Sequence, residues 1–84
     1  MTNTENSRIA IIGIIVSDLG QAPKLNALLS EYQEYILGRM GLPHQKNNLS
    51  LISVAIEAPG DAISALSGKI GMLPGVTSKV VYAN

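Results

Sequence analysis

Two short glycine-containing segments hold the residue types from which binding sites are made. The first is GRMG, in which Gly38 and Gly41 flank Arg39 and Met40. Glycine lets a backbone approach a ligand or another subunit closely, and an arginine can bind a carboxylate through two parallel hydrogen bonds. The segment therefore predicts a ligand or interface site. The alternative is a glycine-relieved bulge near the end of an edge strand, with Arg39 in solvent or paired with a carboxylate of another subunit.

The second segment is SGKIG, which contains Ser67, Gly68 and Lys69. These residue types occur in phosphate-binding loops, but the full pattern of such a loop is absent, and the segment follows a helical pattern rather than a strand. A glycine inside a helix costs about 1 kcal/mol relative to alanine. We therefore expect Gly68 to mark close packing of its helix, with an anion site as the second interpretation. Gly71 is expected to end the same helix.

Catalysis and metal binding have little support. The chain has no cysteine, and this absence excludes disulfides, thiolate metal sites, iron–sulfur clusters and cysteine nucleophiles. It has one histidine, His44. A Ser-His-Asp set is not visible, and Glu31 and Glu34 fall on the polar face of a predicted helix. His44 follows Pro43 and is expected to be a surface residue in a turn. We therefore expect that the protein is not an enzyme and that it has no metal site and no cofactor.

Length and composition narrow the class further. The 84 residues suffice for one domain, expected at residues 8–84 after a disordered polar tail at 1–7. Six basic and six acidic residues cancel, and three tyrosines are the sole aromatic residues, so we expect no direct nucleic-acid binding. The apolar run IAIIGIIV has eight residues, far fewer than the roughly 20 that span a bilayer. A reducing cytoplasm is the expected compartment.

Hydrophobic periodicity predicts the order βαββαβ. The apolar residues of 8–17 lie at both parities, as in a strand covered on both faces, and 23–35 has a helical pattern with a proline in its first turn. Strands are expected at 36–41, 49–57 and 76–82, a turn at 42–48, and a second helix from Asp61 to Leu73. This order predicts an α+β, ferredoxin-like fold: a four-stranded antiparallel sheet with two helices on one face and the first and third strands in the centre.

The other face of such a sheet is bare in a monomer. The first strand has two apolar rows, and the sequence does not tell which of them faces outward: Ile9, Ile11 and Ile15, or Ala10, Ile12, Ile14 and Val16. Strands of about six residues give a face of roughly 400 Å², whereas a standard interface buries about 800 Å² per partner. We expect a dimer or tetramer in which edge strands, loops or helix ends also take part. The alternative is that the tail or a turn covers the face.

Four segments, in order and spacing, resemble the small proteins called iron-only hydrogenase system regulators. They are RIAIIGIIV, ILGRMGLP, LSLISVAI and ISALSGKIGMLPGVTSK, and they extend over about residues 8 to 82. The resemblance implies an ACT-like branch of the ferredoxin-like folds and a homo-oligomeric regulatory or sensor module rather than a catalyst. Any ligand-binding residues would come from GRMG and SGKIG. The identity of an effector and of a protein partner stays open, and the alternative is a structural adaptor without a ligand.

Related families imply sites that this chain does not share. Nickel-responsive repressors resemble it in their C-terminal domain, but they need several histidines, a cysteine and an N-terminal ribbon-helix-helix part that binds DNA. The ligand loop of amino-acid-binding ACT domains reads SDLGQAP here, and Asp18 and Gly20 match it loosely. Neither DNA binding, nor a nickel site, nor amino-acid binding is therefore implied.

Overall fold

The computed structural model describes residues 7–44 and 47–83. The order of its helices and strands is the βαββαβ order that the sequence predicts. The bounds are Ser7–Val16 (β1), Leu19–Gln21 (η2, a 3₁₀ turn), Ala22–Glu31 (α1), Gln33–Tyr35 (η3, a second 3₁₀ turn), Ile36–His44 (β2), Leu49–Pro59 (β3), Gly60–Gly71 (α2) and Val76–Tyr82 (β4). β1 already includes Ser7, which the sequence assigned to the tail, and residues 1–6 lie outside the described residues.

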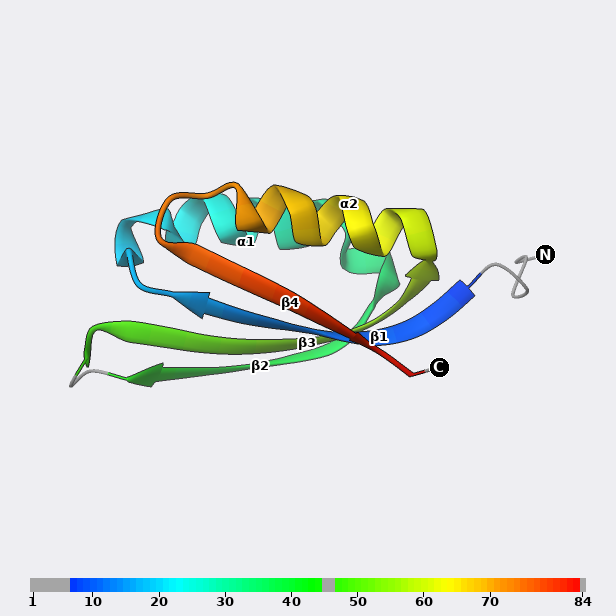
Figure 1. Cartoon of the computed structure of the whole chain (residues 1–84), viewed down its shortest axis with the longest axis horizontal. Coiled ribbons are helices and arrows are strands. Elements are labelled where there is room, and N and C mark those ends of the chain that lie inside the picture. The colour runs from blue at the N-terminus through cyan, green and yellow to red at the C-terminus, as the bar shows by residue number, and fades with distance from the viewer. Residues whose placement is uncertain (1–6, 45–46, 84) are drawn as a thin grey trace.

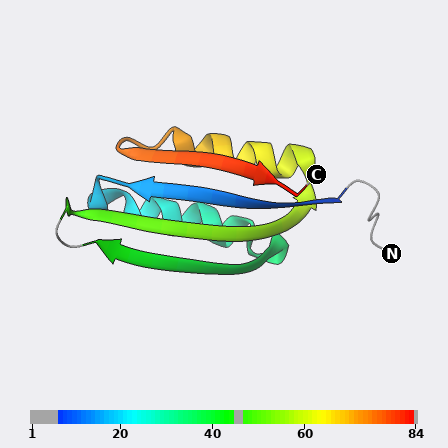
Figure 2. The ribbon, with the colours of Figure 1, turned by 60° about the horizontal axis from the view of Figure 1, so that its bottom comes forward.

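The four strands form one antiparallel sheet in the order β2-β3-β1-β4. Figure 1 shows α1 and α2 together on one face of this sheet, and Figure 2 shows the opposite face, over which no helix lies. The predicted ferredoxin-like fold is confirmed, including the central position of β1 and β3. No helix in the described part of the chain is long and apolar enough to cross a membrane.

A single cluster of buried aliphatic side chains fills the space between the helices and the sheet. Full burial of a valine, leucine or isoleucine side chain stabilises the fold by about 1.5–3 kcal/mol. The cluster consists of Ala10, Ile12, Ile14 and Val16 from β1, Val54, Ile56 and Ala58 from β3, Leu25 and Leu29 from α1, Ile63, Leu66 and Ile70 from α2, and Val76 from β4.

Helix α1 ends four residues earlier than the sequence predicts. Its last residue is Glu31, and the Tyr32 amide bonds the Leu29 carbonyl three residues back at 3.2 Å. Such a bond tightens the chain into the 3₁₀ turn η3, which occupies residues 33–35. Tyr32 and Tyr35 still pack against the core. Apolar contacts at helical spacing therefore continue beyond the end of α1, through the 3₁₀ turn.

Strand β2 is longer than predicted, because it continues to His44 where the sequence predicts a turn from residue 42. Its last three residues pair with β3, and the final pair is His44 with Leu49. β2 is an edge strand, which is where a sheet tolerates proline. The rest of the predicted turn includes Gln45 and Lys46, which lie outside the described residues, as do the side chains of Pro43 and His44.

Helix α2 matches its predicted core pattern but ends differently. Gly71 is its last helical residue, Met72 occupies the cap position, and Leu73 follows the helix. Gly71 is expected to end the helix, but the glycine with a left-handed backbone conformation in this region is Gly75, with φ of 72°. The carbonyl of Gly75 accepts a 2.7 Å hydrogen bond from the Ser17 amide, which joins this turn to the end of β1.

Candidate functional site

The two rows of β1 face opposite sides of the sheet. Ile12 is 0% exposed beneath the helices, whereas Ile9, Ile11 and Ile15 are 48%, 49% and 46% exposed on the other side. The structure thus settles the choice that the sequence left open. The odd-numbered row faces outward.

We call the helix-free side of the sheet the bare face. Its rows follow from the register of the strands, because residues paired across a sheet point to the same side. The outward rows that cross all four strands consist of Gly38, Met40 and Leu42 from β2, Leu51, Ser53 and Ala55 from β3, Ile11, Gly13 and Ile15 from β1, and Thr77, Lys79 and Val81 from β4. Ile9 and Glu57 form a further outward pair on the two central strands. Large apolar side chains are exposed on all three of β1, β2 and β4. An exposed apolar surface that extends over several strands is unusual for a monomeric protein in solvent.

A shallow hollow of about 380 Å³ lies in the bare face. Two small residues of the central strands, Gly13 and Ser53, are paired across β1 and β3 and lie in its lining. Met40 lines it on the β2 side and Lys79 on the β4 side. We call this the face hollow. Its apolar lining, with one cation at the rim, can hold an apolar side chain or an apolar small molecule.

The GRMG segment is divided between the two sides of the sheet. Met40 is on the bare face and is 71% exposed. Arg39 faces the helices, and its Nη2 donates a 3.2 Å hydrogen bond to Oδ1 of Asn26 on α1. This contact is exposed, and the structure records no ion pair for Arg39 among the described residues. The guanidinium therefore keeps donor groups that an anion can accept.

Arg39 also lines a second hollow, which we call the helix-side cleft. This cleft of about 340 Å³ lies between α1 and the β2–β3 half of the sheet. Its polar lining comes from Asn26, Arg39 and Ser50, and its apolar lining includes Leu25 and Ile52. An apolar interior with one cationic group at its wall suits a small molecule that carries a carboxylate or another anion.

The glycines of this segment have open surroundings. The register of β2 and β3 shifts between Ile36 and Gly38, which is the bulge that one interpretation of the sequence predicts. A Cβ added at Gly38 would have no atom within 4 Å, and one added at Gly41 would meet Ile52 at 3.9 Å. Within the described chain, neither glycine is required for close packing.

The residues of the SGKIG segment do not converge. Ser67 faces β4, where its Oγ lies 3.0 Å from Ser78 Oγ and its carbonyl accepts a 2.8 Å hydrogen bond from that hydroxyl. Gly68 lies on the exposed side of α2, with no atom within 4 Å of an added Cβ. The close packing predicted for Gly68 is therefore wrong within this chain, because the side of α2 on which it lies has no neighbour there.

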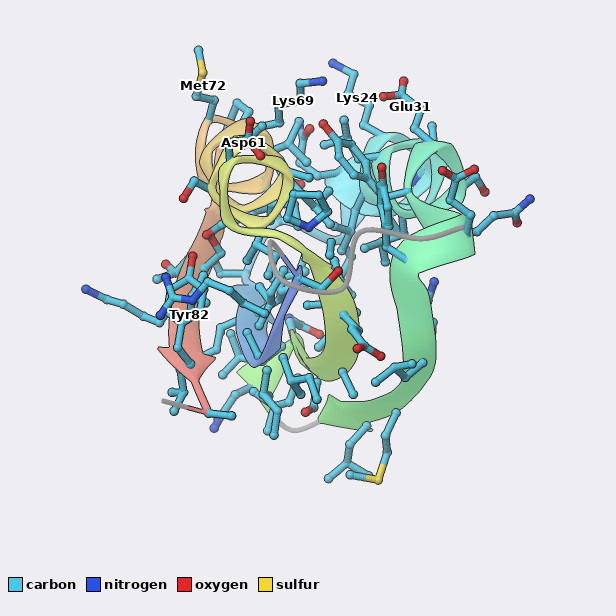
Figure 3. The ribbon with its side chains drawn as sticks, turned by 90° about the vertical axis from the view of Figure 1, so that its right-hand side faces the viewer. Lys24, Glu31, Asp61, Lys69, Met72 and Tyr82 are labelled. Atoms are coloured by element: carbon cyan, nitrogen blue, oxygen red, sulfur yellow. The ribbon has the colours of Figure 1, made fainter. Side chains whose placement is uncertain are left out.

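Lys69 connects the two helices on their outer side. Its Nζ donates a 3.1 Å hydrogen bond to the Tyr32 hydroxyl and lies 4.0 Å from a carboxylate oxygen of Glu31. The hydrogen bond to Tyr32, followed by charge interactions with Tyr32 and Glu31, raises the pKa of Lys69 above its ordinary value. Figure 3 shows Lys69 and Glu31 on the side of the helices away from the sheet. This lysine thus has partners of its own and is directed away from both hollows.

The two glycine-containing segments lie at opposite sides of the molecule. GRMG belongs to β2 at one edge of the sheet, and Ser67 faces β4 at the other edge. One chain therefore cannot combine them in one site. Among the described residues, no three His, Cys, Asp or Glu side chains gather where they could hold a metal ion.

Sequence reasoning missed the residues that give the site its shape. Gly13, Ser53 and Lys79 line the face hollow, and Asn26 is the partner of Arg39. They come from separate segments, so no local motif joins them. The register of β1 with β3 and β4 is the signal that brings them together, and a sequence pattern gives this register to within one residue at best.

Comparisons with known proteins identify relatives of the whole domain. A family model with the description "TM1266-like: Iron-only hydrogenase system regulator, putative" matches residues 8–80. The solved structure of the uncharacterized protein TM1266 from Thermotoga maritima is similar with a TM-score of 0.88 and 37% identity, over 93% of this chain and 99% of that one. None of the curated proteins matches the chain.

A more distant structure shares the fold. It is a formyltetrahydrofolate deformylase from Pseudomonas putida KT2440, similar with a TM-score of 0.63 and 13% identity. The match covers 87% of this chain but 28% of the deformylase. At this identity the likeness shows the fold alone.

Proposed function

The chain belongs to the TM1266-like family of iron-only hydrogenase system regulators, and from that membership we propose a non-enzymatic regulatory module that acts as a homo-oligomer through its bare face. The observation that carries the proposal is the row of half-exposed isoleucines on β1, joined by exposed apolar side chains of β2 and β4. The largest apolar patch on a soluble protein, typically a few hundred Å², is often a contact surface.

The size of the bare face supports association. The strands have seven to eleven residues, longer than the six that the sequence suggested. At about 3.3 Å per residue and 4.8 Å between strands, their footprint is roughly 600 Å². Side chains roughen this plane, so the accessible area is larger and approaches the 800 Å² or so of a standard interface. Leu37, exposed at the bulge of β2, extends the apolar surface.

We propose the helix-side cleft as the place of a small anionic effector. Arg39 supplies the cation, Asn26 holds its guanidinium, and Leu25 and Ile52 supply the apolar lining. The alternative function is a structural adaptor that binds another protein and no small ligand. Native mass spectrometry of protein purified from its own host separates the two, because a retained mass that Arg39→Ala removes supports an effector. Bare subunits in every preparation favour the adaptor.

A partner protein is expected to carry any effect on transcription. Six acidic and six basic residues give no net attraction for a phosphate backbone. The protein alone is therefore expected not to shift duplex DNA at physiological salt. A sequence-specific shift at submicromolar protein would overturn this part of the proposal.

Sedimentation at micromolar concentration tests the association. We expect a dimer or tetramer, and we expect Ile11→Glu to dissociate it, because a charge at the centre of the bare face would lose its water on association. Met72→Glu is the matched control, since Met72 is an exposed apolar residue at the end of α2, away from the bare face. A monomer for the parent chain, or equal effects of the two variants, contradicts the proposal.

A further inference from the structure

The bare face carries two ionisable side chains among its described residues. Glu57 on β3 pairs across the sheet with Ile9, and Lys79 on β4 pairs with Gly13. Both are exposed, and the structure records no ion pair for either of them. One acid and one base thus stand on an otherwise neutral, largely apolar surface.

The two charges cannot reach each other within one chain. They are separated by two strand spacings, since β1 lies between β3 and β4, and by four residues along the strands. At about 4.8 Å per strand and 3.3 Å per residue, the distance between their backbones is roughly 16 Å. The midpoint of the line that joins them falls on Ile11 of β1.

This position has a consequence for a pair of identical chains. In a dimer whose two-fold axis lies in the plane of the interface, each surface point meets a point of the other copy. That point lies at the same height along the axis and at the same distance on its opposite side. If the axis lies in the interface, passes through Ile11 and runs at right angles to the line from Glu57 to Lys79, each acid meets the base of the other copy. One contact geometry then makes two opposite-charge pairs.

The same axis brings apolar residues together. From Ile11 it runs toward Met40, because Met40 lies two strands from β1 on the side away from β4 and in the row of Gly13 and Lys79. Ile11 and Met40 therefore lie on the axis, and each meets its own copy. Both are among the exposed large apolar residues.

We propose that a second copy of this chain covers the bare face in this register, with Lys79 against Glu57 of the partner subunit and Glu57 against the partner subunit's Lys79. This inference rests on the proposed association and specifies its geometry. The apolar rows supply the attraction, and the two charge pairs select one orientation among the many that an apolar surface allows.

Charge reversals test the register. Lys79→Glu and Glu57→Lys each place two like-charge contacts in the dimer, so we expect each to raise the dissociation constant tenfold or more at low salt. The double variant restores both attractions and should return to within about threefold of the parent chain. The matched controls are Lys24→Glu and Glu34→Lys, which make the same changes in net charge at exposed positions outside the bare face.

Mixing gives a second and sharper measurement. The parent chain and the double variant should each form dimers with themselves but not with each other, because a mixed dimer would place base against base and acid against acid. A mass-tagged parent chain in native mass spectrometry reports the mixed species directly. The expected result is a mixed fraction far below the statistical half, which rises in 1 M salt as screening removes the repulsion.

The outcomes separate the two proposals. A parent chain that is monomeric at all concentrations overturns the association and, with it, the register. A dimeric parent chain with unchanged single variants, an unrestored double variant or free mixing overturns the register while the association stands. Weakened single variants, a restored double variant and self-sorting support both.

Discussion

The two faces of the sheet are built from the same residue types but have opposite surroundings. On β1, Ile12 and Ile14 are buried among the helices, while Ile11 and Ile15 on the same strand are about half exposed. The first pair stabilises the single chain, because its side chains leave water when the helices pack on the sheet. The second pair gains its full burial when another surface covers it. An apolar row on the outward side of a strand therefore predicts that a partner covers this face, without predicting which partner.

The helix-covered face also differs in its polar groups. It has Arg39 and Asn26 at a cleft near the edge of the sheet, joined by a hydrogen bond within the chain. The bare face has Lys79 and Glu57, for which the structure records no ion pair. The first arrangement favours a small ligand at a prepared cation, and the second favours a large partner that brings the complementary charges.

The largest expected effect distinguishes the two rows of β1. Ile12→Ala removes a fully buried side chain and should lower the free energy of unfolding by about 2–5 kcal/mol. Ile11→Ala makes the same chemical change at the outward position, and we expect a loss of about 1 kcal/mol or less in the monomer. Denaturant unfolding of dilute protein measures both, and sedimentation should show weakened assembly for Ile11→Ala. Equal losses of stability would contradict the difference between the faces.

An intermediate effect distinguishes the neighbours Arg39 and Met40. Met40→Ala should raise the dissociation constant of the dimer roughly tenfold, since it removes apolar area that association would bury. Arg39→Ala should leave assembly unchanged and lower the stability by about 1 kcal/mol at most, because its recorded hydrogen bond to Asn26 is exposed. It should also abolish any retained anionic ligand in native mass spectrometry. Loss of assembly in Arg39→Ala but not in Met40→Ala would contradict the proposal, because it would place the interface on the helix-covered side of the sheet instead of the bare face.

These pairs of neighbours also show how far the sequence alone could lead. The spacing of apolar residues predicted the order of the elements and the central strands, because helices and strands differ in period and apolar rows must be buried. It could not tell Ile11 from Ile12, since both rows of β1 are apolar and the choice depends on where the helices pack. It placed Arg39 and Met40 in one candidate site, whereas the alternation of a strand sends them to opposite faces.

The length of β2 depended on a partner strand that no local pattern reveals. Pro43 and the residues around it have the composition of a turn, but pairing with β3 extends the strand to His44. Similarly, the cost of a glycine in a helix suggested a neighbour at Gly68, and the neighbour is absent in the described chain. Both deviations arise because tertiary contacts, present or absent, decide what local preference leaves open.

The smallest expected effect concerns Gly68 and tests a third surface, the outer side of α2. Because an added Cβ would have no atom within 4 Å, Gly68→Ala should gain the helix propensity of alanine without strain, about 0.5–1 kcal/mol. For a domain of this size that corresponds to a rise of a few degrees in Tm. Gly75→Ala is the control of opposite sign, since its φ is 72° and its Cβ would lie 2.7 Å from Asp18 Cβ. If Gly68→Ala instead dissociates the oligomer while Met40→Ala does not, the copies meet through α2, and the bare face is covered by something other than a second copy.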